Sequence, residues 1–311
     1  MAKTLKGETF QNRYRITGTL ITASPLHIGT GEGSIGVYST QEQARLREEL
    51  GKVPEVSTVI KDHQGKPMIP GSSLRGVIRH WLLNILSGFG SEWAADRNYE
   101  DPNLTNLSQA EQIAAVKQTF SWLELLFGTP FHEGKVEVWD AICQTQSLQA
   151  PDSLLGWNPN SMTYIDTSVA INPITGTAIE NLLYKTEVVP PGVKFTLDIA
   201  GQNLSDIEIG MLLLALQGFN SRIYPLRVGA HVGRGFGKMK YIPGPIYGLK
   251  DSDLPAWISS TINSFGTGRA GEVQNNESEA AGYFALPKLS VVDQQQLINK
   301  AKTELTGQMR S

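Results

Sequence analysis

The sequence is almost free of cysteine. Cys143 is the single thiol among 311 residues, which excludes an internal disulfide framework and a zinc site built on cysteines. So few thiols are typical of proteins in a reducing compartment. From this feature we expect a cytoplasmic protein.

Long apolar runs are missing as well. No segment approaches the roughly 18–20 consecutive apolar residues that a membrane-spanning helix requires, and residues 1–6 lack the apolar core of a signal peptide. We therefore expect no membrane partner. The net charge of −3 argues against an indiscriminate binder of polyanions, although it permits a local basic groove. Apolar residues, at 40% of the chain, are sufficient for a folded core.

Glycine, in contrast, is abundant and clustered. The 31 glycines exceed the average share of about 7%. They gather in two groups, at 29–36 and at 229–237. Such groups indicate tight turns or a backbone that approaches a ligand closely.

Hydrophobic periodicity predicts an α+β protein. In chain order the expected elements are a strand over 14–23, helices over about 74–86 and 109–127, strands over 135–143 and 194–200, a helix from 205 to about 219, and a strand over 236–242. Without insertions this order is βαββαβ, the ferredoxin-like or RRM-like arrangement. That sheet supports many functions, so the fold by itself decides none.

We expect one such domain over residues 1–264, interrupted by two insertions. The segment 34–54 is charged and favours a surface helix, and the segment 150–185 is rich in Pro, Gly, Asn and Thr, which indicates a protrusion. Residues 265–311 are interpreted as a linker followed by a terminal helix over about 290–308.

The block 71–76 opens the clearest helix of the sequence. Ser72 and Ser73 are candidates for its N-terminal cap, and Arg75 and Arg79 follow one turn apart on the side predicted to face solvent. Free N–H groups at a helix N-terminus attract anions, so this block is a candidate phosphate site. A plain capping turn is the alternative.

The late glycine loop, residues 229–240, is a second candidate site. Its alternating glycines allow the backbone to approach phosphates, and Arg234, Lys238 and Lys240 supply positive charge. Phe236 is placed to stack on a base. The alternative is a glycine-rich strand connection with Phe236 in the core. The spacing does not fit a dinucleotide-binding fingerprint.

The five histidines lie far apart in the sequence. None belongs to a metal-binding spacing, so no metal site is predicted. His27 stands where a strand meets the first glycine group, which suits a contact with RNA or phosphate; a structural role is the alternative. No nucleophile elbow, Walker loop or Cys/His pair is present.

Together these blocks resemble one family. The segments that carry the resemblance are 24–29 (SPLHIG), 69–76 (IPGSSLRG), 126–128 (LFG), 134–141 (GKVEVWDA), 184–192 (YKTEVVPPG) and 233–237 (GRGFG). In this order they resemble the RAMP superfamily and, more narrowly, the repeated backbone subunit of type III (Csm/Cmr) CRISPR effector complexes. The match runs discontinuously from about residue 14 to 243.

The resemblance implies an RRM-like core that assembles along a CRISPR RNA, beside target RNA and other RAMP or Cas subunits. The residues it would bring to RNA are His27, Ser72, Ser73, Arg75, Arg79, Arg234, Phe236 and Lys238. It also implies a thumb hairpin that inserts between bases, within 150–185. The candidate wedge residues there are Met162, Tyr164, Ile165 and Ile171.

Members of the family that cut target RNA carry an aspartate upstream of the proline–glycine–serine block, and a divalent ion such as Mg²⁺ takes part. Counting back without gaps places Glu55 at this position. Glutamate keeps the charge, but its extra methylene displaces the carboxylate. The resemblance therefore implies a binding subunit whose target-RNA endonuclease activity depends on whether Glu55 supports it.

Two other hypotheses stay open. One is a stand-alone RAMP nuclease that processes precursor CRISPR RNA, with His27 or another histidine as acid or base. The other is a ferredoxin-like protein that binds no nucleic acid.

Overall fold

The computed structural model describes residues 3–35, 40–51, 53, 55–95, 107–149, 156–171, 174–265 and 286–309. The linker predicted at 265–283 lies almost entirely outside these ranges. Among the helices within them, none is long and apolar enough to cross a membrane.

The centre of the fold is a four-stranded antiparallel sheet. Its elements follow in the order β1 (Asn12–Thr22), α2 (Gly71–Leu86), β5 (Val136–Val138), β9 (Lys194–Gln202), α5 (Asp206–Gly218) and β10 (Met239–Lys250). The strands lie side by side in the order β10-β1-β9-β5, and every neighbouring pair is antiparallel. This is the βαββαβ connectivity of a ferredoxin-like sheet, so the predicted fold class is confirmed.

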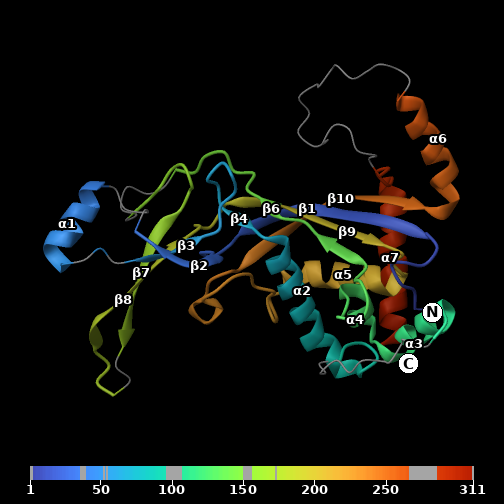
Figure 1. Ribbon diagram of the computed structural model, residues 1–311, viewed down its shortest axis with the longest axis horizontal. Helices are drawn as coiled ribbons and strands as arrows, with labels where there is room; N and C mark the ends of the chain where they lie inside the picture. Colours follow the sequence, from blue (N-terminus) through green and yellow to red (C-terminus); the bar gives the residue numbers. More distant parts are fainter. Residues whose placement is uncertain are drawn as a thin grey trace.

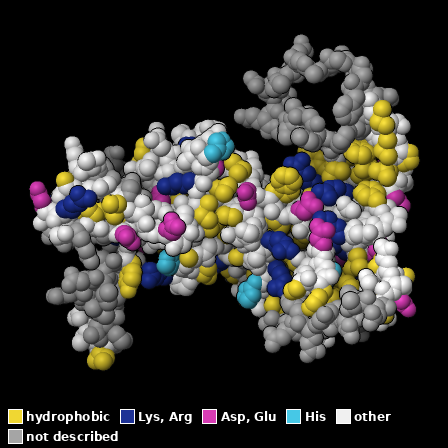
Figure 2. Space-filling model, viewed as in Figure 1, with side chains coloured by type: hydrophobic (Ala, Val, Ile, Leu, Met, Phe, Trp, Pro, Cys, Tyr) yellow, Lys and Arg dark blue, Asp and Glu magenta, His cyan; other side chains and the backbone are white. Residues whose placement is uncertain are grey.

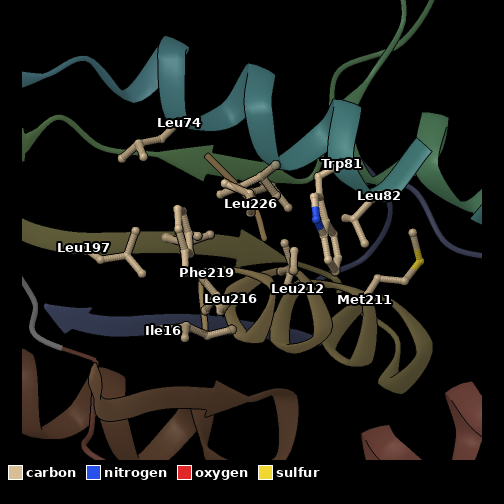
Figure 3. Close-up of a cluster of buried hydrophobic side chains, with 14 of the residues drawn as sticks. Ile16, Leu74, Trp81, Leu82, Leu197, Met211, Leu212, Leu216, Phe219 and Leu226 are labelled. Carbon is tan, nitrogen blue, oxygen red and sulfur yellow. The ribbon is translucent and has the colours of Figure 1, made fainter. Parts of the chain in front are cut away.

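The core lies between this sheet and the helices α2 and α5, which cover one of its faces (Figure 1). Along β1, Tyr14, Ile16 and Leu20 are buried, because alternate side chains of a strand point to the same face. Each fully buried aliphatic side chain stabilises the fold by about 1.5–3 kcal/mol relative to exposure. Figure 3 shows part of this core, with side chains from β1, β9, α2 and α5: Ile16, Leu197, Leu74, Trp81, Leu82, Leu212 and Leu216.

The C-terminal helix α7 (Val291–Gln308) packs on the outer side of α5. Ser290 caps it, since the Ser290 hydroxyl accepts a hydrogen bond from the Asp293 N–H. A Cβ on Gly210 would lie 2.8 Å from the Ala301 carbonyl oxygen, so the two helices meet closely. The predicted terminal helix is confirmed. The preceding helix is α6 (Leu254–Phe265), which follows the 3-10 turn η4 (Asp251–Asp253).

A second sheet extends from the end of the core. Its strands are β2 (Gly29–Ser34), β3 (Val56–Val59), β8 (Ala178–Val188) and β7 (Tyr164–Ile171), in that spatial order. β7 and β8 form an antiparallel hairpin that projects from the body, and α1 (Thr40–Leu50) lies at the far end of the same sheet (Figure 1). The two predicted insertions are therefore a helix and a regular hairpin, whose strands were not predicted.

The prediction of one continuous helix over about 109–127 is wrong. The segment is two helices, α3 (Gln109–Thr119) and α4 (Trp122–Phe127), because the backbone is extended at Phe120 and Ser121 starts a new helix. The Ser121 hydroxyl accepts from the Glu124 N–H, and the Glu124 carboxylate accepts from the Ser121 N–H. This capping box begins a helix wherever it forms, and apolar residues on both sides of the break conceal it.

Two predicted strands have different limits. The strand over 135–143 is divided into β5 and β6 (Ala141–Ile142), because β5 pairs with β9 whereas β6 pairs with β4 (Met68–Ile69). The last strand starts at 239 and continues to 250, because its second half pairs with the beginning of β1.

The start of α2 also differs from the prediction. Pro70 occupies the cap position and makes no side-chain capping hydrogen bond, and Ser72 and Ser73 lie within the first turn. The Gly71 N–H donates instead to the Asp140 carboxylate at 2.7 Å. A Cβ on Gly71 would overlap the Val138 carbonyl oxygen, so this glycine allows α2 to pack against the end of β5. At its other end α2 continues into the 3-10 turn η1 (Ser87–Phe89).

Candidate nucleic-acid interface

The late glycine loop folds back over the connection between β1 and β2. Gly229 and Gly237 have positive φ, of 85° and 77°. A Cβ on either would overlap a carbonyl oxygen, that of His27 or that of Val228. The Gly237 N–H also donates to the Pro25 carbonyl at 2.8 Å. These two glycines therefore serve the close approach of two backbone segments, as only glycine can.

His27 lies beneath this loop and is 4% exposed. Its Nδ1 is 2.7 Å from the carbonyl oxygen of Glu187, which only accepts, so Nδ1 carries the proton. In the neutral ring Nε2 is then an acceptor and takes a hydrogen bond from the Ser57 hydroxyl at 3.2 Å. The predicted contact residue is thus buried, and Ser57 presents its hydroxyl in its place.

His231 stands next to His27, at the start of the 3-10 turn η3 (Val232–Arg234), in a left-handed conformation with φ 60°. The two imidazole rings are 5.6 Å apart, and Phe236 meets the His231 ring edge-on at 5.8 Å. Burial, followed by the positive charge of Arg234, lowers the pKa of His231. The His231 ring is therefore uncharged at neutral pH. Phe236 is half-buried beside it.

Ser57, His231 and Arg234 line a pocket formed by β2, β3, β8 and the glycine loop. The pocket holds about 480 Å³ and is lined by Gly33, Glu55, Ser57, Tyr184, Lys185, Thr186, His231 and Arg234. The structure thus brings Glu55 and Arg234, which are far apart in the sequence, into one site beside His27. On the face shown in Figure 2, basic and histidine side chains gather along the concave margin between the hairpin and the helical part.

Glu55 is exposed and packs over β2. A Cβ on Gly33 would lie 2.6 Å from its Oε2 atom, so the glycine leaves space for the carboxylate. Among the described residues, no group of three or more His, Cys, Asp or Glu side chains is placed to hold a metal ion. A magnesium ion at Glu55 would accordingly take its other ligands from RNA phosphates and water, as this ion commonly does.

Arg75 and Arg79 line a different pocket of about 540 Å³, which shares no residue with the first. The Arg75 guanidinium donates to the Phe127 carbonyl and lies 5.8 Å from the centroid of the Phe127 ring. Both arginines are half-buried, so they are less exposed than predicted. The cause is the segment 127–134, which covers this side of α2.

The wedge candidates that the structure describes are less exposed than other apolar side chains of the hairpin. Met162 is 0% exposed and has a φ of 51°, so it packs at the base of the hairpin and is not free to enter between bases. Tyr164 and Ile165 are half-buried, and the Ile171 side chain lies outside the described residues. Among the hairpin side chains that the structure describes, Val169, Ile174 and Tyr184 are exposed and apolar, at 46%, 92% and 50% exposure.

Sequence reasoning missed Ser57, Tyr184 and Lys185 as parts of the pocket. A signal for the charge of this region was nevertheless present. Between Glu208 and Asp251 the chain has no acidic residue, although it carries six basic ones: Arg222, Arg227, Arg234, Lys238, Lys240 and Lys250. Lys238, one of the predicted contacts, is exposed at the end of the glycine loop.

Comparison with known proteins identifies the family. The sequence profile of the RAMP superfamily matches residues 19–240, which is more than half of the chain and includes both glycine groups. The chain belongs to the RAMP superfamily. This RAMP protein is also similar to "CRISPR system Cms protein Csm5" of Streptococcus thermophilus, with 39% identity over 69 residues. That match covers 21% of the chain and spans 19% of the relative's own length.

Proposed function

We propose that this RAMP protein is a guide-RNA-binding subunit of a type III CRISPR effector ribonucleoprotein, in which it also holds target RNA. Its family and its similarity to a relative named for a CRISPR system support the proposal. The observation that carries it is the pocket, where Lys185 and Arg234 stand at the base of a projecting hairpin. The partners that follow are CRISPR RNA, target RNA and other RAMP or Cas subunits, in the cytoplasm.

The pocket suits the backbone of single-stranded RNA. Arg234 and Lys185 provide positive charge, and the uncharged His231 and the Ser57 hydroxyl provide hydrogen bonds. Such contacts to phosphate and sugar position a strand without reading its sequence. The Tyr184 ring, at 50% exposure, offers a surface on which any base can stack. A protein that holds guides of many sequences requires this kind of contact.

Fluorescence anisotropy of the purified chain with single-stranded RNA tests the proposal. Arg234→Ala should weaken binding about tenfold, which corresponds to about 1.4 kcal/mol. It should also reduce the slope of log affinity against log salt by about 0.7, the effect of one lost phosphate contact. Lys302→Ala removes an exposed charge from α7 and should change neither value. Equal affinity and slope in the wild type and Arg234→Ala would contradict the proposal.

Cleavage of target RNA at the same pocket depends on Glu55. A magnesium ion held between Glu55 and an RNA phosphate would stabilise the negative charge that develops during cleavage. The experiment assembles the complex with guide and labelled target RNA and compares the wild type with Glu55→Ala and Glu55→Asp. Cutting that survives Glu55→Ala removes Glu55 from the reaction. Cutting that occurs only with Glu55→Asp identifies a binding subunit whose carboxylate is displaced by one methylene.

The hydrogen-bonded His27–Ser57 pair favours a second candidate function, the metal-independent processing of precursor CRISPR RNA. In that reaction the 2′-oxygen attacks the adjacent phosphorus, the bond to the 5′-oxygen breaks, and a 2′,3′-cyclic phosphate forms. Ser57 would pass the proton of the 2′-hydroxyl to Nε2 of His27, and solvent would protonate the leaving oxygen. If so, the chain alone cuts repeat RNA in the presence of EDTA and Ser57→Ala does not, whereas a binding subunit cuts none.

A further inference from the structure

Glu187 joins the projecting hairpin to the pocket. It follows the pocket-lining Thr186 on β8 and is 3% exposed. Its Oε1 atom accepts hydrogen bonds from the Lys61 ammonium at 2.6 Å and from the Thr163 hydroxyl at 2.7 Å. Its Oε2 atom accepts from the Val59 N–H at 3.1 Å. A carboxylate is retained in such a buried place only when its charge and hydrogen bonds are satisfied, and these three donors satisfy it.

The donors come from separate parts of the chain. Lys61 follows β3, whereas Thr163 lies in the turn that enters β7, so the Glu187 carboxylate ties both strands of the hairpin to β3. The backbone carbonyl of Glu187 also accepts from Nδ1 of His27, and Nε2 of His27 holds the Ser57 hydroxyl at the wall of the pocket. One residue therefore fixes the hairpin and the pocket to each other.

In the part of the chain that the structure describes, few other links hold the base of the hairpin to the body. Leu26 and Val189 exchange two backbone hydrogen bonds just after β8. Among the described residues, the ladder between β3 and β8 consists of two pairs, Val56 with Lys185 and Ser57 with Thr186. Farther out the two strands pair with each other and extend away from the body (Figure 1). A two-stranded hairpin is marginally stable by itself in water, and this one carries Ile174 near its tip at 92% exposure.

We propose that Glu187 is a positioning residue that sets the direction of the hairpin. It thereby sets the spacing along a bound RNA between the nucleotide in the pocket and the place that Ile174 reaches. The part of this inference that concerns RNA rests on the proposed function, whereas the part that concerns the hairpin does not. Removal of the links to Glu187 lets the hairpin swing while the core stays folded.

The distance from the hairpin tip to the core, measured by pulsed electron paramagnetic resonance, tests the proposal. Nitroxide labels are attached at the exposed positions Ile174→Cys and Gln217→Cys. The natural thiol is removed with Cys143→Ala. Label positions on the hairpin and on α5 report the swing directly, and the measurement needs no RNA.

Two variants weaken the junction and one serves as the control. Thr163→Val removes the hydrogen bond from the hairpin to Glu187 at nearly constant shape, and Glu187→Gln removes the charge. Thr167→Val changes an exposed threonine on the same hairpin strand that is not one of the three donors to Glu187. The reference is the labelled chain that carries only Cys143→Ala, Ile174→Cys and Gln217→Cys. We expect a narrow distance distribution for the reference and for Thr167→Val, and a several-fold broader one for the two junction variants.

RNA binding provides the second readout. A dinucleotide, which fills the pocket alone, should bind the junction variants as tightly as the reference. A longer strand that spans pocket and tip should bind them several-fold more weakly. Narrow distributions in Thr163→Val and Glu187→Gln would overturn the inference, and Thr163→Val decides alone where Glu187→Gln fails to fold. A reference chain that binds no RNA would refute the proposed function, while the distances would still decide the role of Glu187.

Discussion

Gly237→Ala should damage the glycine loop more than Gly235→Ala, although the two glycines are neighbours in the same loop. Both have positive φ, of 77° and 90°, so alanine at either position costs about 1–2 kcal/mol in the left-handed conformation. At Gly237 the added Cβ would also overlap the Val228 carbonyl oxygen, whereas at Gly235 nothing lies within 4 Å. Relief of such an overlap lowers the free energy of unfolding by about 1–3 kcal/mol more, the same range as for overpacking a core.

The expected losses are therefore about 1–2 kcal/mol for Gly235→Ala and about 2–5 kcal/mol for Gly237→Ala. Urea denaturation followed by fluorescence measures both, through midpoints compared at equal slope. RNA affinity should fall in the same order, because the Gly237 N–H ties the loop to the Pro25 carbonyl at 2.8 Å and the loop carries Arg234. Equal midpoints in the two variants would refute the reasoning, since the backbone approach at Gly237 would then not be close.

Three further changes test the fold and the site. Met162→Ala should lower the free energy of unfolding by about 2–5 kcal/mol, because Met162 is 0% exposed; weaker RNA binding at unchanged stability would instead support its predicted role as a wedge. Lys135→Met should lower the free energy of unfolding by about 3–5 kcal/mol, because it leaves the fully buried Glu208 without the ammonium 2.7 Å away. Lys135→Met combined with Glu208→Leu should regain most of that loss, as measured by the urea midpoint. Burial lowers the pKa of His132 below its usual value of about 6.5, so the unfolded chain takes up the proton first as the pH falls. Stability should therefore decline below about pH 6.5, and thermal midpoints of His132→Asn should show a smaller decline.

The ferredoxin-like core could be predicted because each of its elements buries one face. Ile16 and Leu20 alternate along β1, and the apolar positions of α2 recur with the helical period, so periodicity alone identifies both. The resemblance implied a hairpin, but periodicity did not predict its strands, because most of the hairpin lies outside the core, where no apolar period is required. The break at Ser121 escaped for another reason, since a capping box with Glu124 interrupts a helix without disturbing the apolar pattern around it.

The candidate site was predicted in part. His27 and Arg234 belong to blocks that resemble one family, and Glu55 was placed by counting back from another of these blocks. The structure brings Glu55 and Arg234 to one pocket, with His27 beside it through Ser57. Ser57 and Glu187, the hydrogen-bond partners of His27, were not predictable, because the parallel pairing of β3 with β8 joins strands that are far apart in the sequence. Tertiary packing likewise decides the orientation of Arg75, whose guanidinium meets the Phe127 carbonyl.

Photo-crosslinking tests the central claim most directly, namely that guide RNA lies in the pocket between the glycine loop and the base of the hairpin. The chain is bound to CRISPR RNA that carries thiouridine, and the crosslinked peptides are identified by mass spectrometry. We expect crosslinks within residues 184–187 and 229–238, and their loss with Arg234→Ala but not with Lys302→Ala. Crosslinks confined to the sheet of the core, at Arg15 or Tyr247, with none at the pocket, would contradict the claim.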